Sequence, residues 1–155
     1  MKAQQDSSWK TVSEIDLIYK TRMKSSDRPK ITSSKSAYAI LMECWDSDKI
    51  EFIEQFKVLL LNQANKVLGV YQASSGGIAG TVVDIRLLFA SALKANAVGI
   101  IISHNHPSGK TNPSEADKAI TRKIKSAGEL LDIKLLDHLI VTDDTYYSFV
   151  DEGAL

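Results

Sequence analysis

The sequence predicts a single α/β domain built on a mixed β-sheet that is flanked by helices. Its 155 residues suffice for one compact core, and its 44% hydrophobic and 25% charged residues are ordinary globular values. Segments with helical spacing of apolar residues alternate with short apolar runs typical of strands. Their order is helix, two strands, helix, strand, helix and two strands, which favours a mixed rather than a purely parallel sheet.

Residues 1–34 are interpreted as a basic N-terminal extension. Its first thirty residues carry seven lysines and arginines against four acidic residues, a net charge of +3, whereas the remainder carries twelve against fifteen, or −3. An apolar island at residues 15–19 predicts a short strand that docks on the body. The body is then one domain of residues 35–155.

The first half of the body contains one helix and one hairpin. Behind a serine-rich start, apolar residues recur at helical spacing from Lys35 to about Trp45, which predicts an amphipathic helix. Residues 56–61 form a short apolar run, and a polar turn separates them from the apolar residues 67–71. These two runs predict a β-hairpin.

A glycine-rich break over residues 74–80 precedes the second helix. Asp84 is suited to cap that helix, because apolar residues recur at spacings of three and four after it. The following run at residues 98–102, Val-Gly-Ile-Ile-Ile, is too uniformly apolar for a half-exposed strand. We therefore expect a central strand that is covered on both faces.

A polar loop over residues 103–113 separates this strand from the third helix. That helix is expected to run from Ser114 to about Ala127 and to be closed by Gly128. Two last strands, near residues 133–141 and 146–150, flank an Asp-Asp turn. The isolated His138 lies in the first of them, and we expect it to be a hydrogen-bonded core residue.

Two of the three histidines lie in the polar loop, two residues apart. On an extended segment His104 and His106 leave the backbone on the same side, so both rings can reach one ion. Ser114 and Asp117 complete the pattern H-x-H-x(7)-S-x-x-D. Two neutral imidazoles and one carboxylate form the ligand set of catalytic zinc sites, in which water keeps the fourth position and is acidified toward a pKa of about 7.

Each part of this pattern also has a plainer interpretation. A bare H-x-H in a loop is usually a pair of solvated side chains, and Ser-x-x-Asp is close to a capping box, which explains Ser114 and Asp117 without a metal. Neither explains why the helix start lies next to the histidines, at the end of a buried central strand, where open α/β sheets place ligand sites. The combination therefore favours a metal site, provided that the Asp117 side chain turns toward the ion.

His104, His106, Ser114 and Asp117 match the JAMM (MPN+, JAB) metalloprotease motif residue for residue, and the wider sequence HNHPSG…PS…D…LLDHLIV resembles the bacterial RadC-like branch. The resemblance covers residues 56–155 closely and the amino-terminal region more loosely. It implies a cytidine-deaminase-like (JAB/MPN) α/β fold, one Zn2+ bound by His104, His106 and Asp117, and Ser114 donating to the developing oxyanion. JAMM enzymes cleave peptide or isopeptide bonds, so the implied function is a zinc-dependent hydrolase with a protein or peptide substrate.

The resemblance also implies a catalytic glutamate, and this residue is missing from the strand where it is expected. JAMM enzymes use a glutamate on an upstream strand to take a proton from the zinc-bound water and to deliver it to the leaving amine. Residues 67–73 contain no carboxylate, and Gln72 fits the position best. An amide can hydrogen-bond the water but cannot accept its proton at neutral pH. Glu51, Glu54 or Asp137 could substitute only if the fold brings one of them beside the zinc.

Two function classes therefore stay open. One is a metallopeptidase that is weakened by Gln72, and the alternative is a non-enzymatic JAB-fold module that binds protein or DNA in connection with DNA repair. The net charge of the body does not support DNA binding. A zinc deaminase is excluded, because its H-x-E and P-C-x-x-C elements are absent and Cys44 is the only cysteine. The single cysteine and the lack of a long apolar run predict a soluble, cytoplasmic protein without a membrane partner.

Overall fold

The computed structural model describes residues 12–155 apart from residues 14, 17 and 77–81. Its helices are η2 (Ser25–Asp27), α1 (Ser34–Cys44), α2 (Ile85–Lys94) and α3 (Glu115–Leu130), and its strands are β1 (Gln55–Leu61), β2 (Val67–Ser75), β3 (Gly99–Asn105), β4 (Lys134–Val141) and β5 (Tyr146–Ser148). None of these helices has the length and apolar character needed to cross a bilayer.

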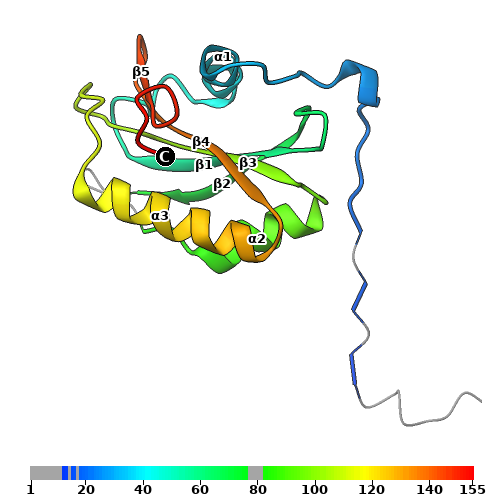
Figure 1. Cartoon of the computed structure of the whole chain (residues 1–155). Helices are drawn as coiled ribbons and strands as arrows, with labels where there is room; N and C mark the ends of the chain where they lie inside the picture. The colour runs from blue at the N-terminus through cyan, green and yellow to red at the C-terminus, as the bar shows by residue number, and fades with distance from the viewer. Residues whose placement is uncertain (1–11, 14, 17, 77–81) are drawn as a thin grey trace, which may run out of the picture.

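The strands form one mixed sheet in the order β2-β1-β3-β4-β5. Only β3 and β4 are parallel, and the other neighbouring pairs are antiparallel. Figure 1 shows α1 on one face of this sheet and α2 and α3 on the other. The predicted α/β class, with a mixed sheet flanked by helices, is confirmed.

The two faces of the sheet carry separate hydrophobic cores, because successive residues of a strand point to opposite sides. Leu59 and Ile101 pack with α1, whereas Val58 and Ile102 pack with α2 and α3. Since β3 also has a neighbouring strand on each edge, all seven of its residues are buried. The apolar run at residues 99–102 is therefore explained by a strand with no exposed side, whereas Val98, which precedes the strand, is exposed.

Polar side chains before the first apolar residues set where the helices begin. At α1, Ser33 accepts a hydrogen bond from the N–H of Ser36, and the Ser36 hydroxyl is paired in turn with the backbone of Ser33. At α2, Asp84 accepts from the N–H groups of Arg86 and Leu87, as expected from the sequence. These bonds satisfy backbone donors that have no partner within the helix.

Several boundaries differ from those expected. β2 runs on to Ser75 instead of ending near residue 71, and β5 ends at Ser148 instead of near residue 150. The hydrogen-bonded ladder of β3 runs on to Asn105, so Ser103 and His104 lie on the strand and not in the polar loop. Gly128 lies inside α3 and does not close it. A Cβ at this position would lie 2.3 Å from the carbonyl oxygen of Ile133. Glycine is therefore needed where the chain returns closely past the helix toward β4.

The extension contacts the sheet without the docking strand expected at residues 15–19. The described residues of that island form no strand, and Leu17 lies outside the described residues. Tyr19 instead donates a hydrogen bond of 2.6 Å from its hydroxyl to the carbonyl oxygen of Leu68, and Lys30 forms an isolated bridge with Lys66. The other described apolar side chains of the island are exposed, so no burial stabilises a strand there.

Replacing Gly128 by alanine is expected to lower the free energy of unfolding by about 1–3 kcal/mol, because the added methyl group would overlap the carbonyl oxygen of Ile133. Gly69→Ala in β2 is the matched control, since a Cβ there meets no atom within 4 Å. Chemical denaturation followed by circular dichroism measures both variants. If Gly128→Ala were as stable as the wild type, the close approach of the two backbones would be refuted.

Candidate metal centre

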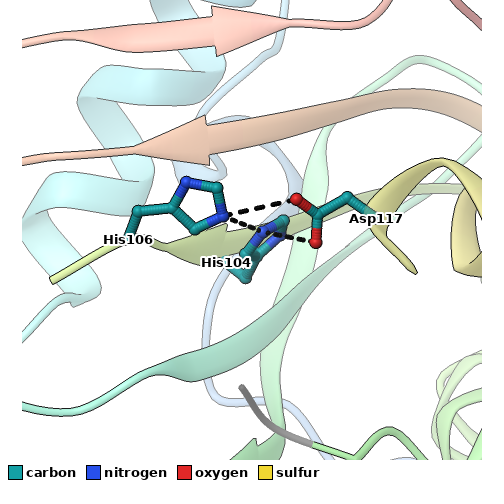
Figure 2. Close-up of side chains that lie close together, drawn as sticks. All are labelled: His104, His106 and Asp117. Atoms are coloured by element: carbon teal, nitrogen blue, oxygen red, sulfur yellow. Dashed lines mark hydrogen bonds and ion pairs between the residues drawn. The ribbon is translucent and has the colours of Figure 1, made fainter. Parts of the chain in front are cut away.

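Three side chains converge where β3 ends and α3 begins. Figure 2 shows His104 on β3 and His106 directly after it, both facing Asp117 of α3. Oδ1 of Asp117 lies 3.1 Å from Nε2 of His104, and Oδ2 lies 3.3 Å from Nε2 of His106. The two Nε2 atoms are 3.0 Å apart. His104 is buried, whereas His106 and Asp117 are only partly buried, so the cluster is accessible from one side.

Strand register and helix capping bring these side chains together. His104 lies opposite Phe56 of β1, on the face of the sheet that α2 and α3 cover. Ser114 is the N-cap of α3: its Oγ accepts from the N–H of Asp117 at 3.0 Å, and its own N–H donates to Oδ2 of Asp117 at 2.8 Å. One carboxylate thus caps the helix and faces both histidines. The capping and the ligand interpretations of Asp117 are compatible.

The hydrogen bonds of the cluster favour an anionic carboxylate between the rings. Burial raises the pKa of Asp117, but the hydrogen bonds from His104 and His106 outweigh burial and hold the pKa well below its usual range. The hydrogen bond to Asp117 in turn raises the pKa of His106 above its ordinary value. The Asp117 side chain therefore keeps its negative charge over the whole physiological pH range.

The three donor atoms suit a small divalent cation. In a tetrahedral zinc site the ligands lie about 2.0–2.1 Å from the metal, which sets neighbouring donor atoms about 3.3 Å apart. In this cluster the two Nε2 atoms are 3.0 Å apart, and each lies near a different oxygen of Asp117, at 3.1 Å from Oδ1 and 3.3 Å from Oδ2. Taking one ligand atom from each residue, the three atoms lie within 4.8 Å of one another. Within the described part of the chain, this is the one group of three or more histidine, cysteine and acidic side chains close enough to share an ion.

Gln72 lies away from this cluster. It pairs with Lys57 of β1, and Lys57 pairs with Ser103, so these three side chains share the face that α1 covers. Oε1 of Gln72 accepts a hydrogen bond of 2.9 Å from Nζ of Lys57, which also lies 5.1 Å from the centre of the Trp45 ring. The role considered for Gln72 needs it beside the histidines, but His104 projects from the opposite face of the sheet.

Glu54 is the acidic residue that the fold brings to the histidines. It directly precedes β1 and lies two residues before Phe56, the partner of His104, so the alternation of strand side chains directs it toward the same face as His104. The pKa of its carboxyl is raised above the ordinary value, mainly because of burial. The charges of His104 and His106 oppose this shift, and the charge of Asp117 adds to it. The carboxyl of Glu54 is thus half-buried and within electrostatic reach of all three candidate ligands.

The other two acidic residues considered from the sequence lie elsewhere. Glu51 is exposed in the turn before β1. Asp137 pairs with Ile101 on the α1 face and accepts a hydrogen bond from the Ser148 hydroxyl. The signal for Glu54 was the alternation of strand residues, since Glu54 and Phe56 fall on one face if the strand pattern is continued backward by two residues.

Comparison with known proteins identifies the family. The model of the RadC-like JAB domain matches residues 31–154. The chain belongs to the RadC-like JAB domain family. A UPF0758 protein of Flavobacterium johnsoniae is 57% identical over 124 residues, which cover 80% of this chain and 53% of that protein. The UPF0758 protein of Porphyromonas gingivalis is 42% identical over 129 residues (83% and 56%), and UPF0758 protein YfjY of Escherichia coli is 44% identical over 102 residues (66% and 64%).

This RadC-like JAB domain spans about half the length of the first two of these relatives. The family match includes all the residues of the cluster and Glu54 as well. The expected resemblance to RadC-like JAB proteins is therefore confirmed, together with a group of side chains that could hold a metal ion. The names of these relatives state no reaction.

The affinity of the cluster for a divalent cation is expected to fall as the pH is lowered. Nε2 of His106 must lose its proton before it can bind a metal, and the hydrogen bond to Asp117 raises the pKa of His106. Below that raised pKa, this one proton lowers the apparent affinity about tenfold per pH unit, and above it the affinity levels off. Metal titrations against a competing chelator between about pH 5.5 and 8.5 measure the effect. A constant affinity over this range would contradict it.

Proposed function

We propose that this RadC-like JAB domain is a zinc-dependent metallopeptidase or isopeptidase-like hydrolase. The observation that carries the proposal is the cluster of His104, His106 and Asp117, in which two imidazole nitrogens and a carboxylate face one another at 3.0–3.3 Å. Two imidazoles and one carboxylate are one of the three-ligand sets with which catalytic zinc sites keep a fourth position open. Bound zinc would polarise a substrate carbonyl and lower the pKa of a water molecule.

Glu54 is the proposed general base and acid of the reaction. A carboxyl group whose pKa is raised by burial exchanges protons more readily near neutral pH than an exposed one does. In the proposed mechanism it accepts a proton from the attacking water and delivers that proton to the leaving amine. Its position supports this role, because it lies two residues before the partner of His104 and the charges of all three candidate ligands act on its pKa.

Ser114 is the proposed donor to the developing oxyanion. In its bond with the N–H of Asp117 the hydroxyl oxygen accepts, which leaves the hydroxyl hydrogen for another acceptor. Since Ser114 lies three residues from a candidate ligand, at the start of α3, a substrate carbonyl at the metal would be near this hydrogen. Removing a single donor of this kind commonly costs about 10²–10³ in kcat.

The alternative, a non-enzymatic module that binds protein or DNA, depended on the lack of a carboxylate in residues 67–73. Glu54 offers such a carboxylate from the residue before β1, which favours the enzyme. The net charge of −3 outside the first thirty residues gives DNA binding no support. We propose a protein or peptide as the substrate.

We expect one zinc ion per chain in protein that is expressed with sufficient zinc and purified without chelator. Asp117→Asn should weaken zinc binding at least tenfold, because it removes the anionic ligand while keeping a side chain that can cap α3. Elemental analysis and zinc titration provide the measurement, with Asp151→Asn as a control, because that carboxylate accepts a hydrogen bond from Ser34 of α1 on the other side of the sheet. Wild-type protein without zinc would refute the ligand assignment.

Glu54→Gln is expected to slow hydrolysis of any accepted peptide by about 10²–10⁴ while zinc stays bound, because an amide cannot carry the proton. Gln72→Glu is the matched opposite change, and it should leave the rate unchanged because that side chain contacts Lys57 on the other face of the sheet. Both variants and the wild type are assayed on one peptide panel. An unchanged rate in Glu54→Gln, or a faster one in Gln72→Glu, would contradict the role of Glu54.

A further inference from the structure

A line of buried hydrogen bonds runs behind the candidate ligands. Nδ1 of His104 lies 2.8 Å from Nε2 of His138 on β4. Nδ1 of His138 lies 2.6 Å from Oγ1 of Thr121 on α3, and this hydroxyl donates to the carbonyl oxygen of Asp117 at 2.6 Å. All three side chains of the line are at most 3% exposed. These hydrogen bonds therefore connect the ring of His104 to the backbone of Asp117 through side chains that are buried from solvent.

The donors and acceptors of this line fix the position of each proton. Thr121 has one hydroxyl hydrogen, which the carbonyl oxygen of Asp117 accepts, so toward His138 its oxygen is an acceptor. His138 then carries its proton on Nδ1, and its Nε2 accepts from the Nδ1–H of His104. In the neutral ring Nε2 of His104 is then left with a lone pair, so the proton that it shares with Asp117 in the metal-free cluster is the one that a metal would replace. Nε2 is the atom that faces Asp117 and His106.

The surroundings of His138 keep its ring neutral, as this arrangement requires. A charged imidazolium would donate from both nitrogens and could not accept from His104. The ring of His138 is fully buried, stacks on Phe149 with 4.6 Å between the ring centres, and lies 6.0 Å from the Phe56 ring. Burial of an unpaired charge between such rings is strongly unfavourable.

The same tautomer of His106, with the proton on Nδ1, is set by a single hydrogen bond. Its Nδ1 lies 2.7 Å from the carbonyl oxygen of Lys110, which can only accept. One backbone bond is thus enough to keep the proton of the neutral His106 ring on Nδ1, which leaves its Nε2 for a metal. His104 has no such partner, because His138 and Thr121 can each either donate or accept. Its tautomer depends on the whole line.

We propose that His138 and Thr121 are positioning residues that hold His104 in the tautomer with an unprotonated Nε2, and thereby raise its affinity for a divalent metal. The inference rests on the proposed zinc site. Without the Thr121 hydroxyl, the Nδ1–H of His138 has no acceptor, and a buried N–H without a partner is less tolerated than a buried acceptor. The proton of His138 then moves to Nε2, the bond to His104 reverses, and Nε2 of His104 carries a proton toward Asp117.

The test compares Thr121→Val, which removes the hydroxyl at similar volume, with Thr121→Ser, which keeps it. Zinc affinity is measured by titration against a chelator. We expect Thr121→Val to bind zinc about 10–100-fold more weakly than the wild type, and Thr121→Ser to stay within about threefold of it. Circular dichroism and thermal unfolding check that both variants are folded.

Nitrogen-15 imidazole shifts supply a second readout that a merely structural role would not change. In the zinc-loaded wild type, His104 and His138 should both be protonated at Nδ1. In Thr121→Val without metal, His138 should be protonated at Nε2. The wild-type spectrum tests the proposal even if the valine variant does not fold, because a proton on Nε2 of His138 in the zinc-loaded protein would overturn it.

The remaining outcomes separate this inference from the proposed function. If the wild type binds zinc and Thr121→Val binds it equally well, the positioning role is overturned and the zinc site stands. A weaker affinity in Thr121→Val with wild-type histidine tautomers would also overturn it, since packing alone would then explain the loss. If the wild type binds no zinc, the proposed function fails and this inference fails with it.

Discussion

The complete burial of β3 is the constraint on which the rest of the structure depends. This strand is paired on both edges and covered on both faces. Near its end it includes a polar residue, His104, which is only 1% exposed. A buried imidazole needs a partner for each nitrogen. The parallel neighbour β4 supplies one partner through His138, and the capped start of α3 supplies the other through Asp117. The polar cluster is thus a consequence of where the core places His104.

Features set by residues near in sequence could be predicted. The serine-rich start of α1, the cap at Asp84, the apolar central strand and the triad His104, His106 and Asp117 each depend on short spacings. The position of Glu54 depends on how β1 pairs with β3. The position of Gln72 depends in addition on a register irregularity between Phe56 and Lys57, which no local pattern signals. Tertiary pairing decides such positions, and a one-residue slip reverses the face of every side chain after it.

Asp117 shows how one side chain can carry both a structural and a chemical role. Its Oδ2 accepts the N–H of Ser114, and both carboxylate oxygens face the histidines. Because the positive end of the helix dipole lies at the start of α3, the same place stabilises the negative charge that a metal ligand must carry. A capping box and a ligand are therefore not competing interpretations here, since the rotamer that closes the helix also presents the carboxylate to the imidazoles.

The segment between His106 and Asp117 has candidate metal ligands at both of its ends. An ion coordinated by the ligands at both ends would cross-link them and close the segment into a loop. Closing a loop restricts the unfolded chain more than the folded one. Metal loading would therefore protect this connection from proteases, and cleavage within it would report how fully the protein is loaded.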